Sequence, residues 1–159
     1  MRNILLGLGA LLLVAFALGR IRRALASDEQ TLRWALEELA EDFNAGRVGR
    51  VASGFHPEYY DQSSGADFET VGNALRALYF QERSTEGFLL RVELPKELLE
   101  VEVQEGVDSA QVEATAFFFR QVGEERKPWW DAKARLSFAR HGKAWRILRS
   151  ENVNHAARR

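Results

Sequence analysis

Asp61, directly after Tyr59 and Tyr60, is the first place in this sequence where neighbouring residue types fit catalysis. A carboxylate beside a phenol can serve as a general acid or base next to a hydrogen-bond donor, provided that burial raises its pKa toward the working pH. The following Gln-Ser-Ser-Gly is typical of a turn, where an aspartate commonly accepts hydrogen bonds from nearby amides. The role in a turn is the commoner one for such an aspartate. The alternative is that Asp61 and Tyr60 form a catalytic pair and line a pocket.

The residue types give little indication that the chain binds a metal, a cofactor or nucleic acid. The three histidines, His56, His141 and His155, lack the spacing of a zinc site, and there is no cysteine to complete one. Twenty-two Lys and Arg against 23 Asp and Glu give a net charge of -1, without the basic excess that binds phosphate backbones. We therefore expect no metal, no cofactor and no nucleic-acid partner.

Two adjacent tryptophans, Trp129 and Trp130, open a segment of alternating apolar and polar residues. On a strand, neighbouring side chains face opposite sides, and parity with Ala132 predicts that Trp130 faces the interior. There it either lines a pocket for a flat apolar ligand, together with Trp145 of the following strand, or belongs to the core.

The outward ring of the pair, Trp129, is expected to share the outer sheet face with Phe117 and Phe119. An exposed apolar patch of this kind usually marks an association surface. Arg135 on the same face would pair with Glu113 or with a partner protein.

The elements that must position these residues follow from hydrophobic periodicity. Two long strands from Trp129 to Asn154 enclose a tight turn at His141-Gly142 and form a half-buried antiparallel hairpin. The upstream pattern predicts three helices and three further strands, at residues 28–43, 48–55, 67–81, 88–92, 99–103 and 111–121, with a short extended piece at 59–61 and a charged loop at 123–127. The fold class is α+β, a curved antiparallel sheet wrapped around a long N-terminal helix.

The N-terminal residues form a membrane-directed segment. An apolar run from Ile4 to Leu18 is followed by Arg20, Arg22 and Arg23. These arginines favour an uncleaved single-pass anchor, spanning residues 4–19, with the domain in the cytoplasm. The alternative is a secretory signal cleaved after Ala26, which would make the domain secreted or periplasmic. The expected organisation is a segment 1–26, one domain 27–155 and a tail 156–159.

Three stretches resemble the nuclear-transport-factor-two-like superfamily, whose members include SnoaL-like polyketide cyclases and ketosteroid isomerases. They are Phe43-Asn44-Ala45-Gly46-Arg47, Phe55-His56-Pro57-Glu58-Tyr59, and Trp145 to Glu151. The resemblance covers residues 28–154 and implies a cone-shaped, cystatin-like α+β fold with a cavity at its wide end. It also implies that the convex sheet face is a place for homodimers or other partners.

The resemblance leaves the activity open, because the superfamily contains isomerases, dehydratases and cyclases as well as non-catalytic binding domains. Asp61 lies near where such enzymes can carry an acid, but no carboxylate base with a Tyr/Asp oxyanion site matches residue by residue. We therefore favour a membrane-tethered, non-catalytic domain that binds a small apolar ligand or a protein partner. The alternatives are a small isomerase- or cyclase-like enzyme using Asp61 and Tyr60, and a structural subunit docking through its convex face.

Overall fold

The computed structural model describes residues 26–85, 87–103 and 107–156. Residues 1–25, which make up all but the last residue of the expected membrane-directed segment 1–26, and residues 157–159 lie outside this part of the chain. Within the described ranges, no helix combines the length and the apolar character needed to cross a bilayer.

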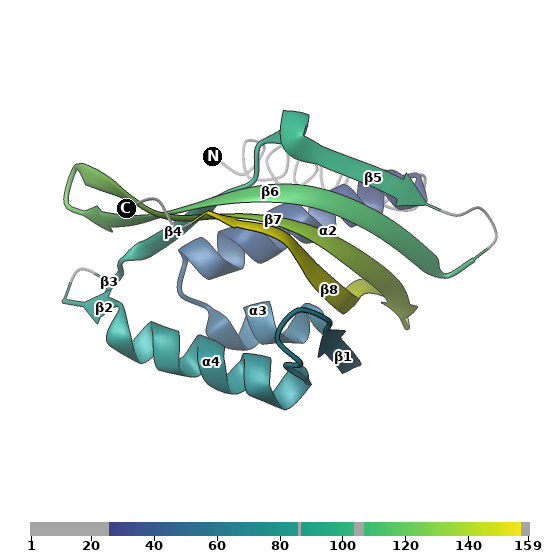
Figure 1. Ribbon diagram of the computed structural model, residues 1–159, viewed down its shortest axis with the longest axis horizontal. Coiled ribbons are helices and arrows are strands. Elements are labelled where there is room, and N and C mark those ends of the chain that lie inside the picture. The colour runs from purple at the N-terminus through teal and green to yellow at the C-terminus, as the bar shows by residue number, and fades with distance from the viewer. Residues whose placement is uncertain (1–25, 86, 104–106, 157–159) are drawn as a thin grey trace, which may run out of the picture.

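Helix α2 (Asp28–Asn44) is the long helix that the sequence predicts. The Ser27 hydroxyl accepts a hydrogen bond from the Gln30 amide at 3.2 Å, and Asp28 and Glu29 place negative charge in the first turn. One stripe of the helix is apolar, and its members Leu32 and Leu36 are buried. Burial of this stripe against the sheet holds the helix in place (Figure 1).

Most of the other elements occur where the periodicity predicts them, with shifted boundaries, but the two-residue strands Arg83–Ser84 and Gly87–Phe88 and the short helix Lys96–Leu98 are not predicted by it. The elements after α2 are α3 (Val48–Ser53), β1 (Phe55–Asp61), α4 (Phe68–Gln81), β2 (Arg83–Ser84), β3 (Gly87–Phe88), β4 (Leu90–Glu93), the short helix η1 (Lys96–Leu98), β5 (Leu99–Val103), β6 (Ser109–Val122), β7 (Glu125–His141) and β8 (Ala144–Ala156). Phe55 belongs to β1 and not to the second helix. The expected charged loop at 123–127 is a tight turn, with Gly123 at φ 57°, and β7 already begins at Glu125.

The sheet is mixed, which corrects the expected antiparallel arrangement. Its strand order is β1-β8-β7-β6-β4, and β5 also pairs with β6. Strand β1 runs parallel to β8, whereas the other pairs of this sheet are antiparallel. A parallel pair needs a long crossover, and here the whole chain between β1 and β8 provides it.

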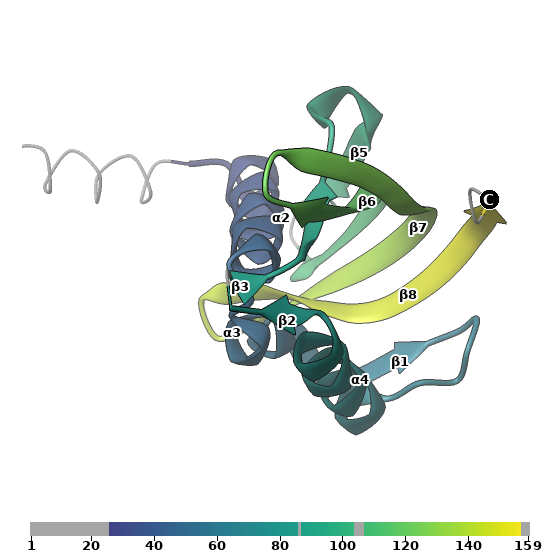
Figure 2. The ribbon, with the colours of Figure 1, turned by 90° about the vertical axis from the view of Figure 1, so that its left-hand side faces the viewer.

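The helices lie on the concave side of the curved sheet (Figures 1 and 2). One core cluster packs α2 against β5 to β8 around Leu32, Val112 and Ile147. A second cluster packs the C-terminal part of α2 against β4 around Phe43 and Leu90. This packing confirms the expected long helix wrapped by a curved sheet. The convex face of the sheet is not covered by these helices.

The C-terminal end of α2 is tied to the edge strand β4. The Asn44 side chain donates to the Val92 carbonyl at 3.0 Å and accepts from the Val92 amide at 2.6 Å, as a neighbouring strand would. The chain then turns at Gly46, whose φ is 67°. A Cβ at Gly46 would lie 2.9 Å from the Phe88 Cβ and 3.0 Å from Tyr79, so this turn requires glycine for both conformation and space.

Gly46→Ala should therefore lower the free energy of unfolding by about 1–3 kcal/mol more than Gly123→Ala. Both glycines have a positive φ, but a Cβ at Gly123 meets nothing within 4 Å, so the control carries the same backbone cost without the clash. Urea unfolding in mild detergent, followed by tryptophan fluorescence, measures the difference. Equal losses in the two variants would contradict the close packing at Gly46.

Candidate functional site

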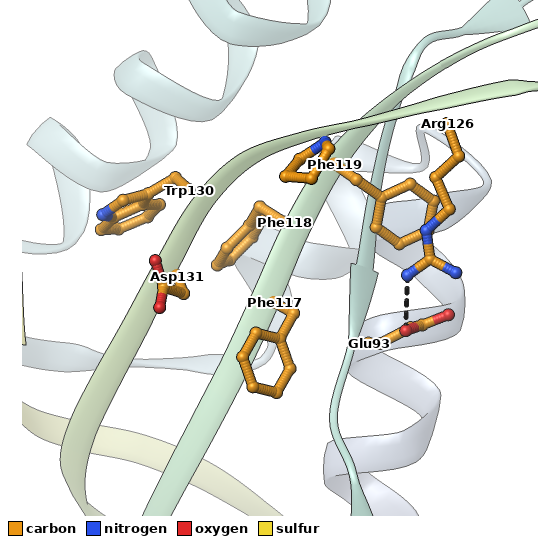
Figure 3. Close-up of a pocket in the computed structure, with 8 residues that line it drawn as sticks. Glu93, Phe117, Phe118, Phe119, Arg126, Trp130 and Asp131 are labelled. Carbon is orange, nitrogen blue, oxygen red and sulfur yellow. Dashed lines mark hydrogen bonds and ion pairs between the residues drawn. The ribbon is translucent and has the colours of Figure 1, made fainter. Parts of the chain in front are cut away.

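A hollow of about 190 Å³ opens where strands β4, β6 and β7 run together, away from the start of α2. Figure 3 shows the residues that line it. They come from three strands and are largely aromatic or charged: Glu93, Phe117, Phe118, Phe119, Arg126, Pro128, Trp130 and Asp131.

Strand register places most of the lining of the hollow on the convex face. Phe117 is paired with Glu93 on one side and with Asp131 on the other, so these three side chains share a face. The neighbouring positions Val92 and Phe118 face the opposite way and pack against the core around Phe43. Most residues that line the hollow therefore belong to the convex face, whereas Phe118 and the Trp130 paired with it border the hollow from the concave side, where the helices lie.

Arg126 forms part of the wall of the hollow by stacking on Phe119. The guanidinium carbon lies 3.4 Å from the centre of the Phe119 ring, and the same group donates to the Glu93 carboxylate at 2.6 Å. Such a cation over an aromatic face is attractive, and the carboxylate fixes its orientation. The hydrogen bond from Arg126 lowers the pKa of Glu93, so Glu93 is ionised at neutral pH.

The two tryptophans occupy different environments. The Trp130 ring stacks on Phe118 at a centroid distance of 5.0 Å, which confirms the prediction that it faces inward. The pairing shifts between Phe118 and Phe119, so that Trp129 is an extra residue in a β-bulge, with its side chain 42% exposed. An exposed aromatic ring therefore adjoins Pro128 and Trp130, both of which line the hollow.

The expected apolar patch of Phe117, Phe119 and Trp129 is only partly exposed. Phe119 is buried beneath Arg126, which corrects the expectation that it is open to solvent. Arg135 lies further along the convex face in a network of ion pairs, 3.6 Å from Glu113 and 3.4 Å from Glu151. Glu113 is one of the two alternatives that the sequence leaves open for Arg135, and Lys133 pairs with Glu113 as well.

Trp145, expected to line a pocket with Trp130, is instead a core residue. Its side chain is buried, and its indole N–H donates to the Thr31 hydroxyl of α2 at 3.0 Å. The Arg140 guanidinium lies over its ring at 4.5 Å. Trp145 therefore joins the start of α2 to the end of the sheet and does not contribute to the hollow.

Asp61, the candidate catalytic residue, is buried at the end of β1. Its carboxylate accepts hydrogen bonds from the Ser64 amide at 3.0 Å, the Ser64 hydroxyl at 2.5 Å and the Ser150 hydroxyl at 2.7 Å. Tyr59 shares the network through a 2.5 Å hydrogen bond to Ser150. Tyr60 is exposed, so the structure brings Tyr59 and not Tyr60 into contact with this group.

The protonation states of this network follow from its hydrogen bonds. Burial raises the pKa of Asp61, but the bonds from Ser64 and Ser150 outweigh it and leave the pKa below its usual value. Burial raises the pKa of Tyr59, the hydrogen bond to Ser150 lowers it, and the charge on Asp61 raises it further, for a net increase. At neutral pH the network thus pairs a carboxylate with a neutral phenol, and both carboxylate oxygens are already bonded.

This arrangement suits a structural role better than proton transfer. A general base must reach a substrate proton, and Asp61 would first have to release its serine donors. The bonds instead close the turn after β1 and connect it to β8, where the Gln62 amide also donates to the Ser150 carbonyl at 2.8 Å. The turn interpretation of Asp61 is thus the one that its contacts support.

Metal ligands do not gather in the described part of the chain. Within residues 26–85, 87–103 and 107–156, no group of three or more His, Asp or Glu side chains is placed to hold an ion. The rings of His56 and His141 do meet edge to face at 5.1 Å, close to the β7–β8 turn.

Asp61→Asn should lower the free energy of unfolding at neutral pH by about 1–3 kcal/mol, because an amide group would then face hydroxyl donors. The lowered pKa of Asp61 in the folded state gives stability above the unfolded pKa, near 4, which is lost as the pH falls through the folded value. The variant should therefore lose less stability on acidification than the parent chain does. Denaturant titrations at several pH values measure this, with Glu124→Gln as control. If Asp61→Asn and the parent chain lost the same unfolding free energy on acidification, the hydrogen-bond network assigned to Asp61 would be contradicted.

Comparison with known proteins supports the fold and gives no specific activity. No protein-family model and no curated protein sequence matches the chain. Several solved structures do match. An NTF2-like protein with a cystatin-like fold from Novosphingobium aromaticivorans aligns with a TM-score of 0.61 and 17% identity, over 86% of this chain and 86% of that chain.

Two further neighbours carry names of different kinds. A candidate calcium/calmodulin dependent protein kinase II association domain from Xanthomonas campestris has a TM-score of 0.60 and 12% identity, over 80% of this chain and 87% of that chain. A candidate scytalone dehydratase from Novosphingobium aromaticivorans has a TM-score of 0.61 and 10% identity, over 81% of this chain and 86% of that chain. Together with the geometry above, these neighbours show that the chain has the nuclear-transport-factor-two-like, cystatin-like fold.

Proposed function

We propose that this chain is a non-catalytic association domain, held at a membrane by its N-terminal segment, which binds a second copy of itself through its convex sheet face. The observation that carries the proposal is the hollow between β4, β6 and β7, with the exposed Trp129 beside it. The association domain among its structural neighbours supports the same class of function.

The size of the hollow favours a protein partner over a small ligand. Sites for drug-sized molecules usually enclose about 300–1,000 Å³, whereas this hollow measures about 190 Å³. A hollow of that size suits one side chain of a partner, and its aromatic lining with an arginine at the rim is typical of interface anchors.

A second copy is the partner that the surface fits best. In a two-fold dimer the same patch serves both subunits, so it must carry both a projection and a recess. The exposed Trp129 adjoins the hollow along β7, and it would enter the hollow of the other copy. The acidic and basic residues that alternate across the same face, Glu113, Lys133, Arg135 and Glu151, give it complementary charges.

The enzymatic alternative has weaker support. It rests on Asp61 with the neighbouring phenol of Tyr59, and on the dehydratase among the structural neighbours. The carboxylate is ionised and bonded to two serines, and it lies outside the hollow. The small-ligand alternative is tested by the same experiment as the dimer.

The dimer is tested by native mass spectrometry and sedimentation of the full chain in mild detergent. We expect the parent chain to be a dimer and Trp129→Ala and Trp129→Glu to shift it at least tenfold toward monomer, because truncating a central aromatic anchor commonly costs about 2 kcal/mol or more. Phe80→Ala removes a side chain that is 66% exposed on α4 and should leave the dimer unchanged. A monomeric parent chain, or dimers that tolerate both Trp129 variants, would refute the proposal. A monomer with a co-purifying apolar molecule would favour the small-ligand alternative.

The membrane tether is tested separately by flotation with lipid vesicles and by intact mass. The full chain should float with the vesicles, whereas a variant starting at Ser27 should remain in the aqueous fraction, because only the former has the apolar run Ile4 to Leu18. A mature mass that corresponds to a start at Ser27 would instead identify a cleaved signal and remove the anchor from the proposal.

A further inference from the structure

The N-terminal segment joins the domain at a defined end. Helix α2 starts at Asp28, and its first turns contact the β7–β8 turn through Asp28 with Arg140 and through Thr31 with Trp145. Apart from Glu93 on β4, the residues that line the hollow belong to the part of β6 and β7 that leads to the β6–β7 turn. That turn lies at the other end of the sheet (Figure 1). The point of entry of the chain therefore lies far from the proposed dimer site.

The tether between the apolar run and α2 is short. It comprises residues 19–27, which extend to at most about 30 Å even when fully stretched. Its sequence includes three basic residues, Arg20, Arg22 and Arg23. The charges on the near end of the domain then decide how that end meets a lipid surface.

The near end presents basic side chains that are not neutralised within the domain. Among its acidic residues, Asp28 and Asp108 both pair with Arg140, and Glu29 pairs with Arg33. Lys143 lies in the β7–β8 turn, and Arg146 lies three residues further on in β8. Within the described residues, no ion pair joins Lys143 or Arg146 to an acidic group.

We infer that the end of the domain formed by the start of α2 and the β7–β8 turn lies against anionic lipid headgroups, with Lys143 and Arg146 as the contacting residues. This inference rests on the proposed tether. Basic groups within about 10 Å of an anionic membrane are attracted to it, and the attraction is screened by salt. In this orientation, the hollow and Trp129 face away from the lipid.

Two exposed valines give a matched pair of probe positions. Val107 lies at the near end, where its neighbour Asp108 contacts Arg140, and Val122 lies at the β6–β7 turn. They are 53% and 52% exposed. Because the chain contains no cysteine, Val107→Cys and Val122→Cys each give a single labelling site in the full chain.

The experiment places the labelled full chain in vesicles of phosphatidylcholine and phosphatidylglycerol in equal parts, with a quencher attached to the lipid headgroups. We expect strong quenching of a fluorophore at position 107 and little at position 122. Lys143→Gln and Arg146→Gln, added to the labelled chain, should each lower the equilibrium constant for this membrane-facing orientation by about fivefold. Lys127→Gln with Arg83→Gln removes the same charge elsewhere and should have no effect.

The outcomes separate this inference from the proposed tether. Chains that float with the vesicles but show equal quenching at both positions, or stronger quenching at position 122, would overturn the orientation and leave the tether intact. Quenching at position 107 that is unchanged by the Lys143 and Arg146 substitutions, or in vesicles of phosphatidylcholine alone, would overturn the role of headgroup charge. Chains that do not float would overturn both the tether and the inference.

Discussion

The continuous pairing of β6 with β7 is the interaction on which the rest of the domain depends. It extends from Ser109 opposite Ala139 to Val122 opposite Glu125, and it is interrupted only by the bulge at Trp129. Its concave side supplies Val112 and Phe138 to the core beneath α2, and its convex side supplies Phe117 and the wall of the hollow. A bulge locally increases twist and redirects side chains, so the residue that interrupts the ladder is also the one that projects beside the hollow.

The buried carboxylate of Asp61 shows how a residue that could do chemistry can instead hold the fold together. An isolated buried charge is costly, but hydrogen bonds from two hydroxyls and an amide compensate for its lost hydration. Those bonds join the last residue of β1 to Ser150 on β8. The edge strand runs parallel to its neighbour and has no short hairpin to hold it, so a polar tie at its end has a clear structural purpose.

Much of the fold was predictable because each element carries its own periodicity. The stripe that includes Leu32 and Leu36 predicted α2, and the turn at His141-Gly142 predicted the last hairpin. The parallel pairing of β1 was not predictable, since period-two alternation does not encode the direction of a partner strand. The boundary of β7 was missed because the charged residues after Gly123 resemble a loop, whereas cross-strand pairing keeps them in the sheet.

The candidate site was less predictable than the fold, because it depends on register. Alternation along the strand placed Trp130 on the inner face, where its ring stacks on Phe118. The extra residue Trp129 reverses the alternation before it, so that Pro128 pairs with Phe119. Glu93 and Arg126 are 33 residues apart, and only the order β7-β6-β4 brings them together over Phe119. Tyr59 replaced Tyr60 as the partner of Asp61, because residues two apart on β1 share a face and both Tyr59 and Asp61 reach Ser150 on β8.

The two ends of the domain differ in what they can contact, and α2 fixes the distance between them. A helix of 17 residues is about 26 Å long, so its start, where the proposed tether would enter, lies that far from its C-terminal tie to β4. The hollow lies near the second end, with Glu93 immediately after the Val92 that Asn44 binds. This separation exceeds the screening length at physiological salt, about 8 Å, so charges at the end proposed to contact lipid would have little influence on the association proposed at the other.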